Sequence, residues 1–197
     1  MIKVLSLDLQ GTLSDAKFSD YFWLEFLPKK YSDKFDVSID DAKKILKSKF
    51  KGYDVYDIKY YDDKYWSDYL GFDTSLALDL FSVRPKINDE LYSLILSFDM
   101  PKIIISTTTD LFIKYELQER IKDFDKIYSC VDYFNVGGKS VDVFKKVCDD
   151  LGVKTNEVLH IGDNKMMDVD NAVKAGLNAI LYDGDFEKFK CELKKYI

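Results

Sequence analysis

The sequence predicts an α/β protein: a doubly wound parallel sheet with a smaller helical domain inserted after the first strand. Apolar runs of strand length recur along the chain, and amphipathic helical patterns lie between the later ones. Strands that alternate with helices form parallel sheets covered on both faces. A long segment after the first apolar run carries helix signals and no convincing strand. The predicted strands are residues 2–7, 102–106, 126–131, 157–161 and 178–182.

The first strand is predicted from an apolar run that stops at Asp8. Between the later strands, apolar residues recur at helical spacing, and Gly152 and Gly176 stand where two of these helices are expected to end. The helices predicted for this part of the chain are residues 91–98, 111–118 and 143–151, with an amphipathic surface helix at residues 186–196.

The predicted insert has its own helix signals. Ser38-Ile39-Asp40-Asp41 resembles a capping box that opens a helix ended by Gly52. A second helix is predicted over residues 57–70, followed by Gly71. Both tryptophans and eight of the 14 tyrosines lie in the insert, and we expect these aromatic residues to pack it rather than to stack on a ligand.

Arg84-Pro85 is the expected point of return to the sheet, because the residue before a proline avoids the helical region. The predicted domains are therefore a core of residues 1–13 and 85–197 and a helical domain of residues 14–84. At 197 residues, the chain has the length of one domain with a smaller inserted one.

Composition excludes several classes of protein. The net charge is −6 and no basic block stands apart from acidic neighbours, which argues against nucleic acid or an anionic membrane as the main partner. No apolar stretch reaches membrane-spanning length, and no signal peptide is recognised. The three cysteines form no CxxC pair, so we expect reduced thiols in a cytoplasmic protein. The sequence gives no indication of the oligomeric state.

Three polar residues follow predicted strands directly: Asp8, Ser106 and Asp163. In open α/β sheets, ligands bind beyond the carboxyl ends of the strands, so we expect these side chains to lie close together. Gly11 allows a sharp turn after Asp8, and the amides of residues 9–12 could face an anion.

These residue types suit the transfer of a phosphoryl group. An aspartate such as Asp8 can attack phosphorus and split hydrolysis into two easier steps. Mg²⁺ would relieve the charge, with Asp8, Asp163 and the backbone carbonyl of Gln10 as ligands. Asp168 is expected to bind the metal directly or to hold one of its waters. Lys139, at a helix start, would neutralise charge on the phosphate and the nucleophile.

Hydroxyl groups are the predicted phosphate donors. Ser106 is favoured because it directly follows an apolar strand, and Thr107, Thr108 and Thr109 are neighbouring alternatives as donors or helix caps. Thr12 supports either the phosphate loop or only its own turn. His160, the sole histidine, lies inside an apolar strand and is predicted to be a core residue.

In this arrangement the chain resembles a hydrolase of the haloacid dehalogenase (HAD) superfamily. The four motifs of that family match Asp8 to Thr12, Ser106, Lys139, and Gly162-Asp163 with Asp168. The resemblance covers residues 1–13 and about 85–185, and the insert fits the position of the family's helical C1-type cap. It implies a Mg²⁺-dependent phosphatase that acts through an aspartyl-phosphate intermediate.

The first motif departs from the family at Gln10. In phosphatases of the family, an aspartate at this position protonates the leaving oxygen and then activates water. Gln10 keeps a backbone carbonyl for the metal and an amide that can donate a hydrogen bond, but it cannot transfer a proton. Acid–base help typically contributes about 10²–10⁴-fold in rate, so we expect weakened catalysis that suits acyl or aryl phosphates best.

The leading hypothesis is a Mg²⁺-dependent hydrolase that removes phosphate from a small phosphorylated metabolite. The alternatives are a noncatalytic phosphate-binding module, a dehalogenase in which Asp8 attacks carbon, and a phosphonate-cleaving enzyme that uses a Schiff-base lysine of the cap. Lysines of the insert such as Lys49 and Lys51 are predicted to be solvated surface rather than substrate contacts.

Overall fold

The computed structural model describes residues 1–79 and 81–197, so residue 80, which falls in the predicted insert, lies outside the described residues. Five parallel strands form one sheet in the order β3-β2-β1-β4-β5. The first strand is central, and the chain winds outward from it in both directions, as the predicted doubly wound fold requires. The strands are β1 (Val4–Leu7), β2 (Lys102–Ser106), β3 (Lys126–Ser129), β4 (Val158–Gly162) and β5 (Asn178–Leu181).

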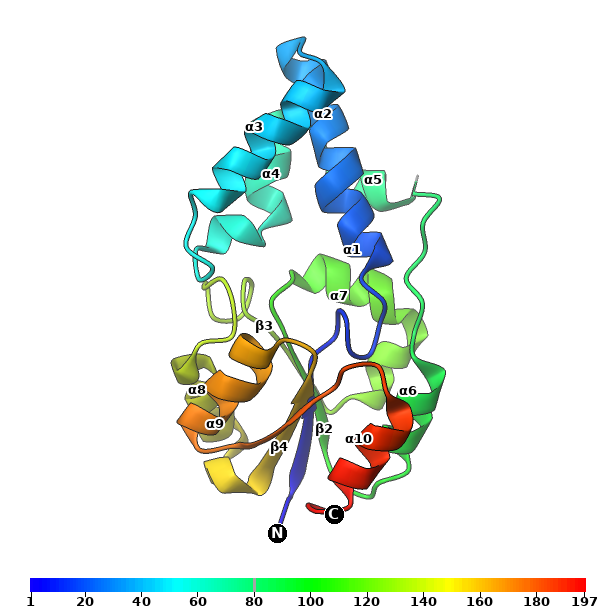
Figure 1. The fold of residues 1–197 in the computed structure, drawn as a ribbon, viewed down its shortest axis with the longest axis vertical. Coiled ribbons are helices and arrows are strands. Elements are labelled where there is room, and N and C mark those ends of the chain that lie inside the picture. Colours follow the sequence, from blue (N-terminus) through cyan, green and yellow to red (C-terminus); the bar gives the residue numbers. More distant parts are fainter. Residues whose placement is uncertain (80) are drawn as a thin grey trace.

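All five predicted strands are confirmed, with ends that shift by at most two residues. Helices cover both faces of the sheet (Figure 1). One face packs against α6, α7 and α10, and the other packs against α8 and α9. These helices are α6 (Asp89–Leu96), α7 (Asp110–Leu117), α8 (Val141–Leu151), α9 (Asn171–Ala175) and α10 (Phe186–Leu193). Short helical turns lie at η3 (Gln118–Asp123), η4 (Thr155–Glu157) and η5 (Lys165–Asp170).

The residues described between β1 and α6 contribute helices and no strand of the sheet. Figure 1 shows these inserted helices at the end of the molecule opposite both chain termini. We call them the inserted helices: α1 (Lys17–Tyr21), η1 (Phe22–Phe26), α2 (Leu27–Phe35), α3 (Ile39–Lys51), η2 (Ile58–Tyr60), α4 (Asp63–Leu70) and α5 (Thr74–Asp79).

Local sequence explains where the inserted helices begin and end. Ser38 caps α3 by accepting a hydrogen bond from the backbone of Asp41, and the helix runs to Gly52 as predicted. The prediction of one continuous helix over residues 57–70 is wrong. Asp62 accepts a hydrogen bond from the backbone of Lys64 and starts a new helix there, so a short turn and α4 replace one continuous helix.

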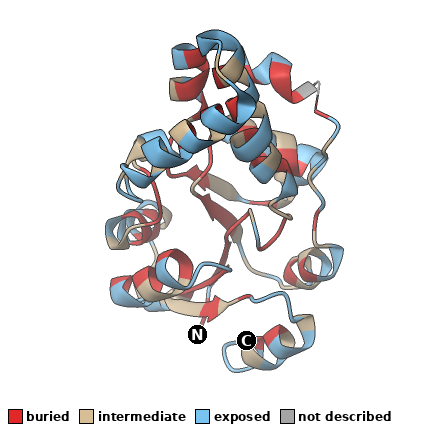
Figure 2. Ribbon diagram, turned by 45° about the horizontal axis from the view of Figure 1, so that its top comes forward, coloured by how far each residue is buried: buried red, intermediate tan, exposed pale blue. Residues whose placement is uncertain are grey.

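Two apolar clusters hold the inserted helices. One cluster, built within the insert, contains Leu46 and Trp66 and joins α2, α3 and α4. The other places Phe18 and Phe22 against Phe112 of α7 and so fixes the insert to the core. Most strand residues are buried, whereas the outer surfaces of the inserted helices are exposed (Figure 2). Within the described part of the chain, helices with the length and apolar character needed to cross a membrane are absent.

Candidate active site

Asp8 lies one residue beyond β1, at the carboxyl edge of the sheet. Its backbone amide donates to the carbonyl of Ile161 in β4 at 2.8 Å, which fixes its place beside the end of that strand. Gly11 then turns the chain with a φ of 87°, and a Cβ atom there would lie 2.3 Å from a carboxylate oxygen of Asp163. The turn therefore requires glycine both for its backbone angle and for the close approach of Asp163.

Three carboxylates meet at this edge. Asp8, Asp163 and Asp168 each offer an oxygen within 4.8 Å of the others. Asp8 and Asp168 are buried, whereas Asp163 is exposed toward the solvent side. Close packing brings them together, because a Cβ atom on Gly162 would lie 2.3 Å from the carboxyl carbon of Asp168.

Lys139 joins two of these carboxylates. Its side chain is 2% exposed, and the ammonium group forms ion pairs with Asp8 and Asp168. Asn171 of α9 donates to the backbone carbonyl of Lys139 at 2.8 Å and fixes the approach of the chain. Burial opposes the charge of Lys139, but attraction to Asp168 and Asp8 outweighs burial and raises its pKa. Lys139 is therefore a permanent cation at the centre of the site.

The carboxyl groups of the two buried aspartates have pKa values shifted in opposite directions. Burial raises the pKa of Asp8 to about 8, and repulsion from Asp168 adds to the effect. Burial also acts on Asp168, but Lys139 and a hydrogen bond from His160 outweigh it and lower the pKa. Asp8 thus needs more positive charge nearby than Lys139 supplies if it is to stay ionised at neutral pH.

Residues that the sequence did not place in the site hold Asp168 in position. His160 in β4 is fully buried, as predicted, and its Nε2 lies 3.2 Å from Asp168. Burial lowers the pKa of His160, so the ring is neutral, with Nε2 donating to the carboxylate. Nδ1 then accepts from the Ser6 hydroxyl at 2.8 Å. The second oxygen of Asp168 accepts from the backbone of Asn164 at 2.9 Å. The free oxygens for a metal are therefore mainly those of Asp8 and Asp163.

Gln10 is held by a buried acid that the sequence did not single out. Glu116 of α7 is 3% exposed, and its two oxygens accept hydrogen bonds from the Gln10 amide nitrogen and the Ser14 hydroxyl. Burial raises the pKa of Glu116 to about 7. One N–H of the Gln10 amide donates to Glu116, which leaves the carbonyl oxygen as an acceptor and the second N–H as a donor. The sequence did contain a signal for this contact: Glu116 lies between Ile113 and Leu117 on the apolar face of α7, where an acidic residue must be buried.

The predicted hydroxyl donors lie along the same edge. Ser106 ends β2, is buried, and accepts a weak 3.4 Å hydrogen bond from the backbone of Thr108. Thr107 and Thr108 line the cavity described below. Thr109 instead donates to Asp63 of α4 at 2.6 Å and so ties the core to the insert. The Thr12 hydroxyl lies 3.5 Å from a carboxylate oxygen of Asp8, which favours support of the turn.

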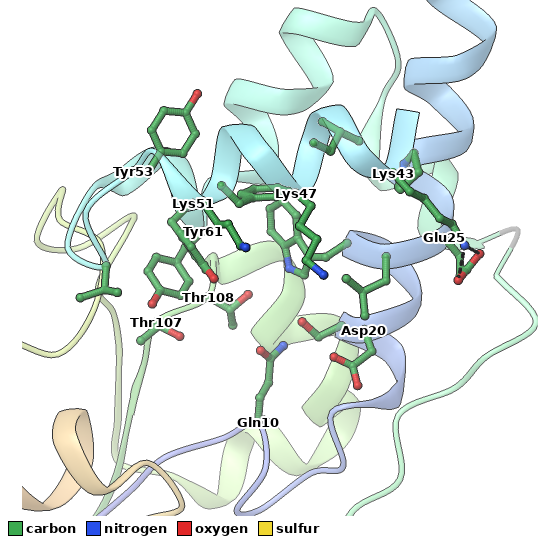
Figure 3. Close-up of a pocket in the computed structure, with 18 residues that line it drawn as sticks. Gln10, Asp20, Glu25, Lys43, Lys47, Lys51, Tyr53, Tyr61, Thr107 and Thr108 are labelled. Carbon is green, nitrogen blue, oxygen red and sulfur yellow. Dashed lines mark hydrogen bonds and ion pairs between the residues drawn. The ribbon is translucent and has the colours of Figure 1, made fainter. Parts of the chain in front are cut away.

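A cavity of about 910 Å³ lies between this edge and the inserted helices. Gln10, Thr107 and Thr108 form its floor, and α3 forms the facing wall (Figure 3). Lys51, predicted to be solvated surface, is exposed but lines this cavity, and Lys47 does the same one turn earlier. Lys49 does not belong to the lining.

The donor set fits a hard divalent cation. Three carboxylates and one lysine leave a formal charge of −2 at the site, counted from Asp8, Asp163, Asp168 and Lys139. Oxygen ligands of this kind suit Mg²⁺. A bound Mg²⁺ would cancel that charge and keep Asp8 ionised.

No family model matches the chain. Over 73 residues, 36% of this chain, the sequence is 32% identical to the GMP/IMP nucleotidase YrfG of Escherichia coli. The nucleotidase of the same name from Shigella flexneri matches equally well. The match covers 32% of each of these proteins, so the chain spans about a third of the length of the curated relatives it matches.

Solved structures match over nearly the whole chain. An HAD phosphatase from Thermococcus onnurineus superposes with a TM-score of 0.77 at 21% identity, covering 94% of this chain and 88% of that one. An HAD-family enzyme from Bacteroides thetaiotaomicron, in complex with magnesium and inorganic phosphate, gives 0.61 at 18% identity over 96% and 99% of the two chains. The chain has the fold of the HAD superfamily, and the resemblance indicated by its motifs is confirmed at that level.

Proposed function

We propose that the protein is a Mg²⁺-dependent phosphohydrolase that acts on small phosphorylated metabolites through an aspartyl phosphate on Asp8. The observation that carries this proposal is the buried Asp8 carboxylate, ion-paired to Lys139 and grouped with Asp163 and Asp168 at the carboxyl edge of the sheet. The fold neighbours named as HAD phosphatases and the partial match to a nucleotidase support the same class of reaction.

Each residue has a proposed role in the first half of the reaction. An oxygen of Asp8 attacks phosphorus, and the bond from phosphorus to the leaving oxygen breaks. Lys139 balances the charge of the nucleophile and of the phosphoryl oxygens, and Ser106 with Thr107 donates to those oxygens. The amides around Gly11 and Thr12 face the same anion. Asp8 and Asp163 would hold Mg²⁺, helped by the backbone carbonyl of Gln10, and Mg²⁺ would supply charge neutralisation.

Asp168 has a positioning role in this proposal. Its oxygens already accept from Lys139, His160 and the backbone of Asn164, so it would act toward the metal through water. In the second half, water attacks phosphorus, inorganic phosphate leaves, and Asp8 is restored. The acceptor oxygen of Gln10 would orient that water without taking its proton, and the proton passes to solvent.

A leaving oxygen that needs no proton fits this site best, because Gln10 cannot supply one. We therefore propose that acyl and aryl phosphates turn over faster than alkyl phosphates of similar size. The second candidate function is a noncatalytic phosphate-binding module. It is favoured by the state of Gln10, which donates to Glu116 and has no proton to give to a leaving group.

We also propose that residues 14–84 act as a cap domain and that the protein works in the cytoplasm. The apolar cluster built within the insert supports the first point, and the three free cysteines support the second.

A panel of acyl, aryl and alkyl phosphates, assayed with Mg²⁺ and with EDTA, tests the proposal. We expect turnover of acetyl phosphate and p-nitrophenyl phosphate that EDTA abolishes and added Mg²⁺ restores. Phosphate binding without turnover of any ester, measured by calorimetry, would replace the hydrolase with the binding module.

A further inference from the structure

The cavity above the candidate active site has a charged wall. Lys43, Lys47 and Lys51 are spaced by four residues on α3, so they lie on one side of the helix, and all three line the cavity. Figure 3 shows the ammonium groups of Lys47 and Lys51 directed into the cavity, toward the floor formed by Gln10 and Thr108. The α3 wall therefore directs ammonium groups toward any ligand bound next to Gln10 and Thr108.

These lysines differ in whether they are already neutralised. Lys43 forms hydrogen bonds of 2.7 Å to both oxygens of Glu25, so its charge is used within the protein. Lys47 and Lys51 form no ion pair with any residue that the structure describes. The acidic residues of the lining are Glu25, paired as above, and Asp20. Two free cations thus face one free carboxylate. The lining has a formal charge of +1, counted from Asp20, Glu25, Lys43, Lys47 and Lys51, in a protein whose net charge is −6.

The rest of the lining is largely apolar or aromatic. Trp23, Phe50 and Tyr61 belong to it, and the cavity of about 910 Å³ is large for a phosphate alone. A ligand of metabolite size would fill such a space, with its body against the aromatic side chains. Charged groups that converge in a cleft of this kind attract and orient an oppositely charged part of the ligand.

We propose that the substrate is a phosphomonoester whose leaving group carries a second anionic group, bound by Lys47 and Lys51, with an apolar or ring-shaped body between the two anions. This inference rests on the proposed phosphohydrolase function and names its substrate class. The reacting phosphate would lie at Asp8 and Lys139, and the second anion would lie on the α3 wall. Asp20 would accept a hydrogen bond from a hydroxyl or amine of the body.

The turnover test compares matched esters. The bisphosphates of ethanediol, butanediol and hexanediol are assayed against the corresponding hydroxyalkyl monophosphates on the wild-type protein, on Lys47→Gln/Lys51→Gln and on Lys44→Gln. Lys44 is the matched control, because it lies on α3, pairs with Asp41 at 3.4 Å and does not line the cavity. We expect the wild type to prefer at least one bisphosphate. The double variant should lower the ratio of kcat/KM for bisphosphate over monophosphate by about 100-fold, about tenfold for each charged hydrogen bond.

A binding test separates this inference from the proposed function. Calorimetry on the Asp8→Asn protein measures the affinity of hexanediol bisphosphate and of hydroxyhexyl phosphate without turnover. We expect the bisphosphate to bind more tightly, and the difference to disappear when Lys47→Gln/Lys51→Gln is added but to persist with Lys44→Gln.

The outcomes are distinct. Lysine-dependent binding of the second anion, together with no turnover of these esters, of acetyl phosphate or of p-nitrophenyl phosphate, would overturn the hydrolase and keep the anion site. Turnover with an unchanged bisphosphate ratio in the double variant would overturn the anion site and keep the hydrolase. Equal losses for both esters in the double variant would show that the lysines bind the reacting phosphate, which also contradicts the inference.

Discussion

The lysines on the two sides of the cavity differ in burial and in pairing. At the carboxyl edge of the sheet, Lys139 is buried and ion-paired with Asp8 and Asp168. On the facing wall, Lys47 and Lys51 of α3 are exposed and have no acidic partner among the described residues. Buried ion pairs are held in one geometry. Exposed lysine side chains stay flexible, and their ammonium groups are available to bind an anionic ligand. The comparison indicates that the core edge carries the chemistry and the α3 wall carries the selection of the substrate.

The largest expected effect lies on the core side. Asp8→Asn keeps the size of the side chain and removes the nucleophile, so turnover of p-nitrophenyl phosphate should fall at least about 10³-fold. Steady-state assays with excess Mg²⁺ measure this loss, and circular dichroism controls for folding. A folded variant that keeps more than about a tenth of the wild-type rate would remove Asp8 from the mechanism.

Removing the buried cation should be the next largest change. Lys139→Met leaves Asp8 and Asp168 buried without their partner, and loss of one member of a buried pair costs about 3–5 kcal/mol. Urea unfolding of the metal-free protein measures this loss. The matched control is Lys126→Met, since Lys126 forms a partly exposed pair with Asp150, and solvent screening makes the loss of such a pair small. Equal losses of unfolding free energy in the two variants would contradict the role of Lys139 as the cation that stabilises the buried Asp8 and Asp168.

The Gln10 position should respond to the return of a proton donor. Gln10→Asp should raise hydrolysis of alkyl phosphates by about 10²-fold and that of acyl phosphates less, because only the former need a proton at the leaving oxygen. Glu116 accepts a hydrogen bond from Gln10, so an acid introduced there would face a second acid.

The paired variant Gln10→Asp/Glu116→Gln is therefore expected to exceed the single variant, because it restores one donor and one acceptor across the contact. The ratio of alkyl to acyl turnover in the two variants is the measurement. An unchanged ratio of alkyl to acyl phosphate turnover in both variants would mean that the lack of a proton donor at Gln10 does not limit the reaction.

The smallest expected effect concerns stability and pH. The pKa of Glu116 is raised from 4.5 to about 7 in the folded protein. The stability that its protonated form contributes is fully present below pH 4.5 and is lost as the pH rises through about 7. Glu116→Gln removes this titration, so the variant should gain about 1–3 kcal/mol relative to the wild type between those limits. Parallel urea curves at the two ends of the range check it, and a constant difference would refute the raised pKa.

Much of the core was predictable because it depends on short-range patterns. Apolar runs predicted all five strands, and strand ends placed Asp8 and Asp163 at one edge. The contacts of Gln10 and Asp168 were not predictable from local patterns. Glu116 lies 106 residues from Gln10. His160 lies only eight residues before Asp168, but the turn that follows β4 decides that the two side chains meet. The break in the predicted helix at residues 57–70 followed from the capping by Asp62, which competes locally with the apolar periodicity.

The cavity wall was the least predictable part of the site. Lysines at helical spacing on an exposed helix are usually solvated, and Lys51 shows no difference from Lys49 in the sequence. Only the packing of the inserted helices against the core decides which of the two lines the cavity.

The aspartyl phosphate on Asp8 can be tested directly by chemical trapping. Since Gln10 cannot take a proton from water, the second half of the reaction should be slow and the phosphoenzyme should persist. The protein is mixed with acetyl phosphate and Mg²⁺, quenched with acid, reduced with borohydride and mapped by peptide mass spectrometry. We expect Mg²⁺-dependent conversion of Asp8 to homoserine. Turnover of acetyl phosphate with an unmodified Asp8, or with the modification at another residue, would contradict it.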